Sequence, residues 1–436
     1  MNLMTTKTVS LANISSSRLS KLTRLGIVLA CILWGGALTG HTHCVRAQSP
    51  SPKVVKPLPV SWDWAVLGKA PKTYEVPKEW EADRPGVRAL LYDGLPYKGK
   101  PTKVFAWLGI PDHKPGEKVP AVVFIHGGGG TADDNVVNMW VKRGYACISI
   151  DDVGSYPNAK EKPDIGGPRG NGECFEQVND DPKEQWMYHA VGQIALANSL
   201  LRSMPEIDAN KIGITGLSWG GVVTSVVAGV DHRFKWAAPV YGGAHLEDSE
   251  FFKPVLAAFG TEKWIGLWDA QQYLPHAKMP MLWITGTNDD YFQMPEWQKS
   301  YRLPQGPRTI LLNWRMVHAP WAGSDPKEIE VFADSIVRGG EPLPRVGTPK
   351  RTGTRVTVPV ESRSPIVKAE LTHTADTGAW SKRDWKIDQV TVTPDAKGRT
   401  TVSGTLPTGT RVWYVRVEDS RGVKVSSDHE ELSAPL

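Results

Sequence analysis

The sequence is poor in cysteine and lacks the residue spacings of known metal and redox sites. It has four cysteines in 436 residues, and no two of them form a Cys-x-x-Cys pair. It also has no His-Glu-x-x-His segment. Because zinc sites and thiol redox centres usually carry such signatures, we expect neither a metal nor a cofactor.

Long apolar runs are scarce, and the clearest one lies near the start of the chain. Leu25–Leu38 is apolar but shorter than the roughly 20 residues that a membrane-spanning helix needs. Basic residues without acidic ones precede it, and the segment Val45–Ala47 resembles a signal-peptidase site. We therefore predict a signal peptide over residues 1–47, a mature chain from about Gln48, and a secreted or periplasmic protein. A retained membrane anchor is the alternative; a lipoprotein is excluded, because no small residue precedes Cys44.

An excess of charge is also missing once the predicted leader is removed. The full chain has a formal net charge of +5, from 51 Lys and Arg against 46 Asp and Glu. Residues 1–47 hold five basic residues and no acidic one, so the remainder has 46 of each sign. A neutral chain has no electrostatic reason to bind nucleic acid or an anionic membrane. We expect neither as a partner, and the sequence leaves the oligomeric state open.

Strand-like and helix-like segments alternate through the middle of the chain, residues 102–341. This alternation predicts an α/β fold, with a mostly parallel sheet and helices on both faces. The expected strands are Lys103–Ile110, Ala121–Ile125, Tyr145–Ile150, Ile212–Thr215, Trp236–Tyr241, Pro280–Gly286 and Thr309–Trp314, and Val87–Tyr92 in the segment before them also has strand character. The expected helices are Val136–Arg143, one capped by Asp181 that runs through Leu201, Val222–Val230, and one from Asp325 to Gly339. The aperiodic stretch Val153–Asp180 is long enough to form a lid.

The two flanking regions differ in composition from this middle part. Residues 48–101 are rich in proline and tryptophan and are expected to form an N-terminal arm. Residues 342–349 look like a linker. Residues 350–436 alternate β-branched and polar residues, which predicts a small C-terminal all-β sandwich. We expect this sandwich to take no part in the chemistry, so that a chain ending near Gly340 would keep its activity.

The segment Ile212–Gly221 carries the clearest functional signal. Ser218 stands between Gly216 and Gly220, after a predicted strand and before a predicted helix. In this context Gly-x-Ser-x-Gly forms a tight turn that exposes the serine at the carboxyl end of a sheet. We therefore predict that Ser218 is a nucleophile.

A serine nucleophile needs a base and an orienting acid, which in this arrangement follow the serine in the order acid, then histidine. Asp289 follows the strand that ends at Gly286, and Asp290 is the alternative acid. His318 follows the next strand and is the candidate base. The later histidines, His373 and His429, lie in the predicted sandwich.

A glycine run, His126–Gly130, directly follows the strand that ends at Ile125. Such a run lets backbone amides approach a substrate carbonyl, and we predict an oxyanion hole formed by the amide of Gly128 or Gly129 and that of Trp219. A phosphate-binding loop is excluded because no Gly-Lys-Ser/Thr follows. We expect a structural role for His126.

Together these segments resemble the α/β-hydrolase superfamily, and within it secreted proteins of the acetyl xylan esterase and dienelactone hydrolase type. The resemblance covers Val87–Gly340 and implies a serine carboxylic ester hydrolase without a cofactor. The phrase from Pro205 to Gly221 also resembles prolyl oligopeptidase-type serine peptidases. Leu217 and Trp219 beside the serine depart from the acetyl xylan esterase pattern, which leaves the substrate open.

Tryptophan is abundant, with 18 in the chain. Trp264, Trp268 and Trp321 lie in segments near the predicted catalytic residues, where they could stack on sugar rings or fill the core. Our first hypothesis is a secreted serine esterase that removes acetyl groups from a carbohydrate through an acyl-enzyme. The alternatives are a prolyl oligopeptidase-type peptidase and a non-catalytic glycan-binding protein.

Overall fold

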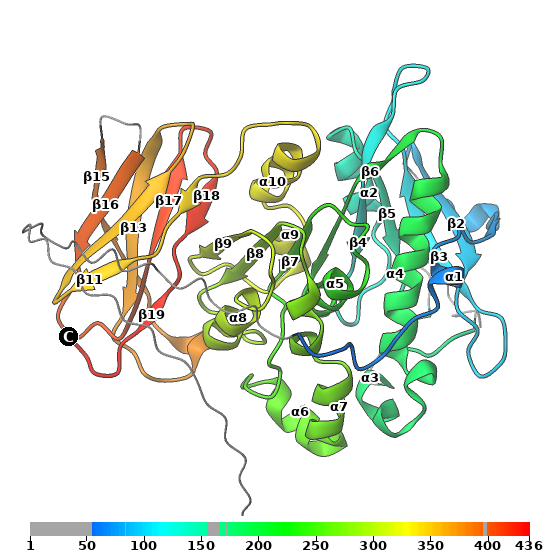
Figure 1. Cartoon of the computed structure of the whole chain (residues 1–436), viewed down its shortest axis with the longest axis horizontal. Coiled ribbons are helices and arrows are strands. Elements are labelled where there is room, and N and C mark those ends of the chain that lie inside the picture. The colour runs from blue at the N-terminus through cyan, green and yellow to red at the C-terminus, as the bar shows by residue number, and fades with distance from the viewer. Residues whose placement is uncertain (1–54, 83, 155–165, 171–172, 396–398) are drawn as a thin grey trace, which may run out of the picture. The chain divides into compact units, whose positions relative to one another are not determined.

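The computed structural model describes residues 55–82, 84–154, 166–170, 173–395 and 399–436. The predicted signal peptide and part of the predicted lid lie outside these residues. Within them, a large mixed sheet with helices is followed by two smaller antiparallel sheets (Figure 1). No helix in the described ranges is both long and apolar enough to span a membrane.

The described residues place nine strands in the large sheet, in the order β1-β2-β3-β5-β4-β6-β7-β8-β9. The neighbours from β5 through β9 run parallel, and β1, β2 and β3 are antiparallel to their neighbours. The bounds are β1 Thr73–Tyr74, β2 Val87–Asp93, β3 Lys103–Gly109, β4 Val119–Ile125, β5 Ala146–Ile150, β6 Ile207–Leu217, β7 Ala237–Val240, β8 Met281–Gly286 and β9 Arg308–Asn313. The predicted α/β fold class is confirmed.

Both faces of this sheet are covered by helices, which explains the continuous apolar runs of its central strands. Every residue of β4 is buried. Helices α4 (Trp186–Ser203) and α5 (Trp219–Val230) contact one face, and α2 (Asp134–Lys142) and α10 (Lys327–Val337) contribute to the apolar cluster on the other. Strands buried on two faces cannot alternate in polarity, because neither side meets water.

The predicted cap at Asp181 belongs to a different element. Its side chain accepts a hydrogen bond from Lys183 N, at 2.9 Å, and caps the short 3-10 helix η3 (Pro182–Glu184). The long helix α4 begins only at Trp186. Proline at the first position is compatible with an α-helix and with a 3-10 helix. The capping signal at Asp181 therefore predicted that a helix begins there but not which type of helix it is.

Several short helices were not predicted from the sequence. Figure 1 shows α3, α6 and α7 together beside the sheet. The helices are α1 Trp64–Leu67, α3 Glu173–Glu176, α6 Phe252–Phe259, α7 Thr261–Leu267, α8 Met294–Tyr301 and α9 Pro320–Gly323, with 3-10 turns η1 Lys78–Trp80, η2 Gln177–Asn179, η4 Ala270–Gln272, η5 Leu274–His276 and η6 Trp380–Lys382.

The predicted N-terminal arm, residues 48–101, contributes two strands to the large sheet. Strand β2 pairs with β3 from Val87–Gly109 to Asp93–Lys103, and β1 pairs with β2. The sheet therefore starts before residue 102, where the arm was predicted to end. The domain boundaries themselves stay a prediction.

The C-terminal region forms two five-stranded antiparallel sheets, which we call the β domain (residues 345–436). One sheet has the order β10-β12-β16-β15 with β11 paired to β12, and the other β14-β13-β17-β18 with β19 paired to β17. The bounds are β10 Arg345–Val346, β11 Lys350–Thr352, β12 Arg355–Glu361, β13 Ile366–Thr374, β14 Lys386–Gln389, β15 Thr391–Pro394, β16 Arg399–Thr405, β17 Val412–Asp419, β18 Lys424–Ser426 and β19 Glu430–Glu431. The predicted all-β region is confirmed.

Strand β17 is buried on both of its faces. Trp413 and Val415 belong to the apolar cluster that fills the β domain, whereas Val412 and Tyr414 belong to the cluster that contains α4 and α5. Strand β18 meets the edge of the large sheet, where Ser426 Oγ accepts a hydrogen bond from Leu312 N at 3.0 Å. The β domain therefore shares its core with the α/β part.

Two cysteines outside the predicted leader are placed by the structure. Cys147, on β5, and Cys174, on α3, are both buried, and no disulfide joins them. Burial raises the pKa of the Cys147 thiol well above its usual value. This cysteine is therefore an apolar core residue rather than a reactive thiol.

Candidate active site

Ser218 occupies a strained turn between β6 and α5. Its backbone has φ 57° and ψ −123°, in the positive-φ region that residues other than glycine rarely adopt. A Cβ at Gly216 would lie 2.5 Å from Gly220 O, and one at Gly220 would lie 2.3 Å from His126 O. Both glycines are therefore required, because any side chain there would separate backbone segments that are in contact.

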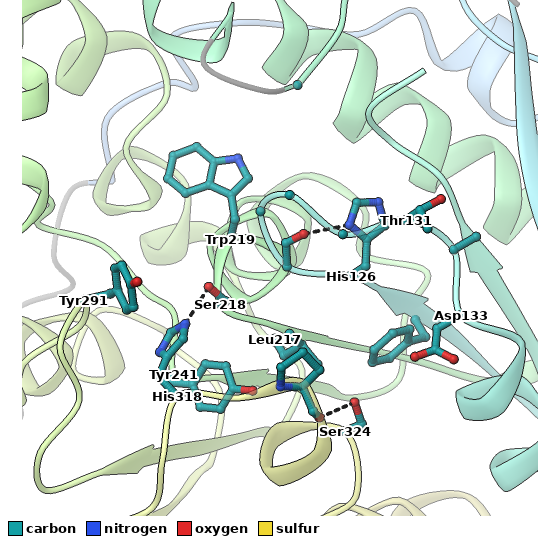
Figure 2. A pocket seen from close by; sticks show the side chains of 18 of the residues that line it. His126, Thr131, Asp133, Leu217, Ser218, Trp219, Tyr241, Tyr291, His318 and Ser324 are labelled. Carbon is teal, nitrogen blue, oxygen red and sulfur yellow. Dashed lines mark hydrogen bonds between the residues drawn. The ribbon is translucent and has the colours of Figure 1, made fainter. Parts of the chain in front are cut away.

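Ser218, His318 and Asp289 form one chain of hydrogen bonds. Ser218 Oγ lies 2.8 Å from His318 Nε2, and His318 Nδ1 lies 2.8 Å from Asp289 Oδ2. Asp289 follows β8 and His318 follows β9. Since these strands and β6 all run parallel, their carboxyl ends meet at one edge of the sheet, which brings together residues far apart in the sequence. Figure 2 shows the imidazole of His318 directed at the hydroxyl of Ser218.

The two candidate acids, Asp289 and Asp290, differ in their surroundings. Asp289 is 2% exposed, and its Oδ1 accepts hydrogen bonds from Tyr291 N at 2.9 Å and Phe292 N at 2.8 Å. These amides leave Oδ2 directed at His318. Asp290 is exposed. The geometry therefore favours Asp289 over Asp290 as the partner of His318.

Aromatic rings enclose the imidazole of His318. The ring centroid of Tyr241 lies 4.2 Å from that of His318, and the centroid of Tyr291 lies 4.5 Å from it. The hydroxyl of Tyr241 donates to Ala319 O at 2.9 Å. Burial, helped by the charge of Asp289, raises the pKa of Tyr241, so its hydroxyl stays a donor and fixes the loop beside His318.

The predicted oxyanion-hole amides lie next to Ser218. Gly127, Gly128 and Gly129 line the same pocket as Ser218, and a Cβ at Gly128 would lie 3.5 Å from Trp219 Cβ. Gly129 has φ 71°, which glycine tolerates without strain. Trp219 is the first residue of α5, so its amide has no acceptor within the helix.

His126 forms a buried ion pair behind this loop. Its Nε2 lies 3.0 Å from Asp152 Oδ1, and its Nδ1 lies 2.8 Å from Gly127 O. Because both ring nitrogens face acceptors, both must carry a proton to satisfy them. Burial of the ring opposes this charge, but the charge and hydrogen bond of Asp152, with Asp151, outweigh burial and raise the pKa of His126 to about 9. His126 thus has the structural role predicted for it, and it fixes the start of the glycine loop.

A pocket of about 740 Å³ opens over Ser218 and His318. Much of its wall is aromatic, and none of these wall residues except Trp219 was predicted: Phe175, Trp219, Phe251, Phe252 and Tyr291. Phe251 and Phe252 stand at the start of α6, where Phe252, Val255, Leu256 and Phe259 recur at helical spacing, a signal that could have located this helix. Phe175 comes from α3, at the end of the predicted lid.

The three tryptophans proposed as substrate contacts are placed differently from one another. Trp264 and Trp268 are completely buried and lie outside the pocket wall; their indole N–H groups donate to Cys174 O and Gln185 Oε1. They therefore cannot stack on a sugar, and we correct that assignment. Trp264 instead supports the wall, since its ring lies 5.2 Å from Phe175 and 6.1 Å from Trp219. Trp321 on α9 is 76% exposed and follows Pro320, a wall residue.

One group of side chains in the described ranges has ligand atoms close enough for a metal ion. His245, Glu247 and Asp248 have ligand atoms within 4.8 Å of one another. Glu247 already accepts from Gln271, and Asp248 pairs with Lys299. Such pairs are typical of a hydrated surface, and the group supplies no reason to assign a metal.

The sequence and fold were compared with those of known proteins. Residues 72–247 match the family model of acetyl xylan esterase (AXE1). This range includes the glycine loop and Ser218 but ends before Asp289 and His318. Among solved structures, the acetyl xylan esterase from Paenibacillus sp. R4 is 22% identical with a TM-score of 0.50, over 62% of this chain and 92% of that one.

This part of the chain has the α/β-hydrolase fold. With the family match, it is a carboxylic ester hydrolase that resembles acetyl xylan esterases, and its substrates are small-molecule or polysaccharide esters. The acetyl xylan esterase from Thermoanaerobacterium sp. JW/SL YS485 is 18% identical with a TM-score of 0.48, over 59% of this chain and 87% of that one. Acylaminoacyl peptidase from Pyrococcus horikoshii is 17% identical with a TM-score of 0.46, over 60% of this chain and 44% of that one. A search of curated proteins finds no match.

The charge on His126 makes the stability of this α/β-hydrolase depend on pH. A folded-state pKa of about 9, above the usual 6.5, contributes stability that is complete below about pH 6.5 and lost as the pH rises through 9. The contribution is at most roughly 3–4 kcal/mol, because each tenfold gain in proton affinity on folding adds roughly 1.4 kcal/mol. We expect Asp152→Asn to unfold at a lower temperature than the wild type at pH 7, and the gap to shrink toward pH 10. Melting curves by circular dichroism would measure this, and a gap independent of pH would contradict it.

Proposed function

We propose that this chain is a serine esterase in which Ser218 is the nucleophile, His318 the general base and Asp289 the acid that orients His318. The hydrogen-bond chain from Ser218 Oγ to Asp289, with both distances at 2.8 Å, is the observation that carries this proposal. An acceptor nitrogen at that distance can take the serine proton during attack. The buried carboxylate stabilises the imidazolium that results.

In the first half-reaction, Ser218 Oγ attacks the carbonyl carbon of the ester while its proton passes to His318 Nε2. The tetrahedral oxyanion lies against the amides of Trp219 and of Gly128 or Gly129, which are donors already in place before the reaction. Collapse of this intermediate breaks the ester bond, and His318 returns its proton to the departing alcohol. The acyl group then remains on Ser218.

In the second half-reaction, water attacks the acyl-enzyme. His318 accepts the proton of the water, and a second oxyanion forms in the same place. Its collapse breaks the bond between the acyl group and Ser218 Oγ, His318 returns the proton to that oxygen, and the carboxylic acid departs. The pocket over Ser218 and His318 leaves room for the alcohol side of a large substrate. Both half-reactions use the same three side chains.

For the substrate, we propose an acetylated carbohydrate. The match of residues 72–247 to acetyl xylan esterases supports the acetyl group. The exposed indole of Trp321, next to the wall residue Pro320, offers a stacking face for a sugar ring. Export to the periplasm or beyond, expected from residues 1–47, would bring the enzyme to such a polymer.

Ser218→Ala should abolish ester hydrolysis while leaving the fold intact, because it removes only the attacking oxygen. We expect the rate on p-nitrophenyl acetate to fall by about 10⁴- to 10⁶-fold, as in other serine hydrolases. A fluorophosphonate probe should label the wild type at Ser218 and fail to label the variant. Retained activity in the variant, or labelling at another serine, would remove Ser218 from this role.

Trp321→Ala should weaken binding of acetylated xylan without affecting a small ester. Aromatic stacking contributes about 0.5–1.5 kcal/mol, so KM for the polymer should rise roughly 3- to 10-fold while KM for p-nitrophenyl acetate stays unchanged. Trp64→Ala is the matched control, since Trp64 is 41% exposed but lies on α1, outside the pocket wall. The proposal of an acetylated carbohydrate substrate would be contradicted if the two variants had equal effects. It would also be contradicted if the enzyme cleaved long-chain esters or prolyl amides in preference to acetyl esters.

A further inference from the structure

The loop that carries Asp289 is hydrogen-bonded to the β domain. Asn288, the residue directly before Asp289, donates from Nδ2 to Ser381 O at 3.1 Å and to Arg383 O at 2.8 Å. Its Oδ1 accepts from Thr287 Oγ1 at 2.8 Å. All polar atoms of the Asn288 amide therefore have partners, and two of the three bonds cross to residues about 95 positions later in the chain.

The loop that carries His318 is held from the same side. At the end of β9, Asn313 Oδ1 accepts from Arg416 Nη1 on β17 at 2.7 Å. The same guanidinium donates from Nε and Nη2 to Glu370 on β13, at 3.0 and 2.5 Å. Arg416 is only 9% exposed and Glu370 5%. This buried, charged group thus fixes the direction of Asn313 from within the β domain.

The two loops are also bonded to each other. Thr287 N donates to Asn313 O at 3.2 Å, and Arg315 N donates to Thr287 Oγ1 at 3.0 Å. One network therefore runs from the β domain through Asn288 and Thr287 to Asn313 and back to Arg416. Asp289 and His318 each extend from a segment of this network.

We propose that the β domain positions the acid and the base of the active site, and that Asn288 is the positioning residue through which it acts on Asp289. This inference rests on the proposed roles of Asp289 and His318. The carboxylate of Asp289 must meet Nδ1 of His318 in one orientation, and a misplacement of about 1 Å can cost a reaction roughly 10²-fold. Asn288 does not line the pocket, so it acts by holding its neighbour.

A chain ending near Gly340 is then no longer expected to keep its activity. Removing the β domain would remove the acceptors of Asn288 and the donor of Asn313 together. It would also remove Trp385 and Tyr414 from the apolar cluster that includes α4 and α5, and the remaining apolar residues of that cluster would lose this cover. The truncation therefore cannot separate loss of fold from loss of positioning, and single side chains must be changed instead.

Asn288→Ala in the full chain tests the proposal, with Gln298→Ala as the matched control. Gln298 on α8 also makes a side-chain hydrogen bond to the β domain, from Nε2 to His429 O at 2.8 Å, but lies on neither catalytic loop. We expect both variants to lower the unfolding temperature by similar amounts. Only Asn288→Ala should reduce kcat for p-nitrophenyl acetate, by about 10- to 100-fold, with KM within about twofold of the wild type.

A second variant covers the case in which Asn288→Ala does not fold, and a second measurement tests the position of Asp289 without turnover. If Asn288→Ala does not fold, Asn313→Ala carries the same expectation from the other loop. The low-field proton resonance of His318 Nδ1–H, bonded to Asp289 and absent in His318→Ala, should shift or broaden in Asn288→Ala and stay unchanged in Gln298→Ala. This readout needs no turnover, so it tests positioning even if Ser218→Ala were to disprove the proposed function. A wild-type kcat and an unshifted resonance in Asn288→Ala, or equal losses of kcat in both variants, would overturn the proposal.

Discussion

The site depends on backbone contact at a single turn. Ser218 holds a positive φ that costs of order 1–3 kcal/mol for a residue with a side chain, and this conformation persists because the surrounding backbone leaves no alternative. Gly216 and Gly220 let the turn close, and the missing Cβ of Gly220 lets α5 lie against the carbonyl of His126. The same contact therefore exposes the serine and sets the glycine loop beside it. The buried pair of His126 and Asp152 holds that loop from its other side.

The parts of this site that follow from local rules could be predicted from the sequence. Parallel strands end at one edge, so Ser218, Asp289 and His318, each placed just after a strand, were expected to meet. The central strands were recognised because burial on two faces leaves an unbroken apolar run, as in β4. The expected strand positions agree with the sheet to within a few residues.

What the sequence did not predict depends on contacts between distant segments. Phe251 and Phe252 reach the pocket from the start of α6, and Trp264 packs behind Phe175 rather than in the wall. Composition alone cannot distinguish a tryptophan that faces substrate from one that supports the residue that does. The hydrogen bonds of Asn288 to Ser381 and Arg383 could not be predicted either, because nothing in the sequence of either segment indicates that the two are in contact.

The β domain is built as part of the catalytic unit rather than as a tethered module. The expected linker is itself bonded: Arg345–Val346 pairs with β12, and Arg421 donates to Glu341 O and Pro342 O, both at 2.8 Å. Strand β17 is apolar on both faces, one packed within the β domain and the other packed against the α/β core. If the two parts separated, the second face would be exposed to water. The serine is thus supported from inside the large sheet, by glycine contacts, whereas the acid and base loops receive additional support from outside it.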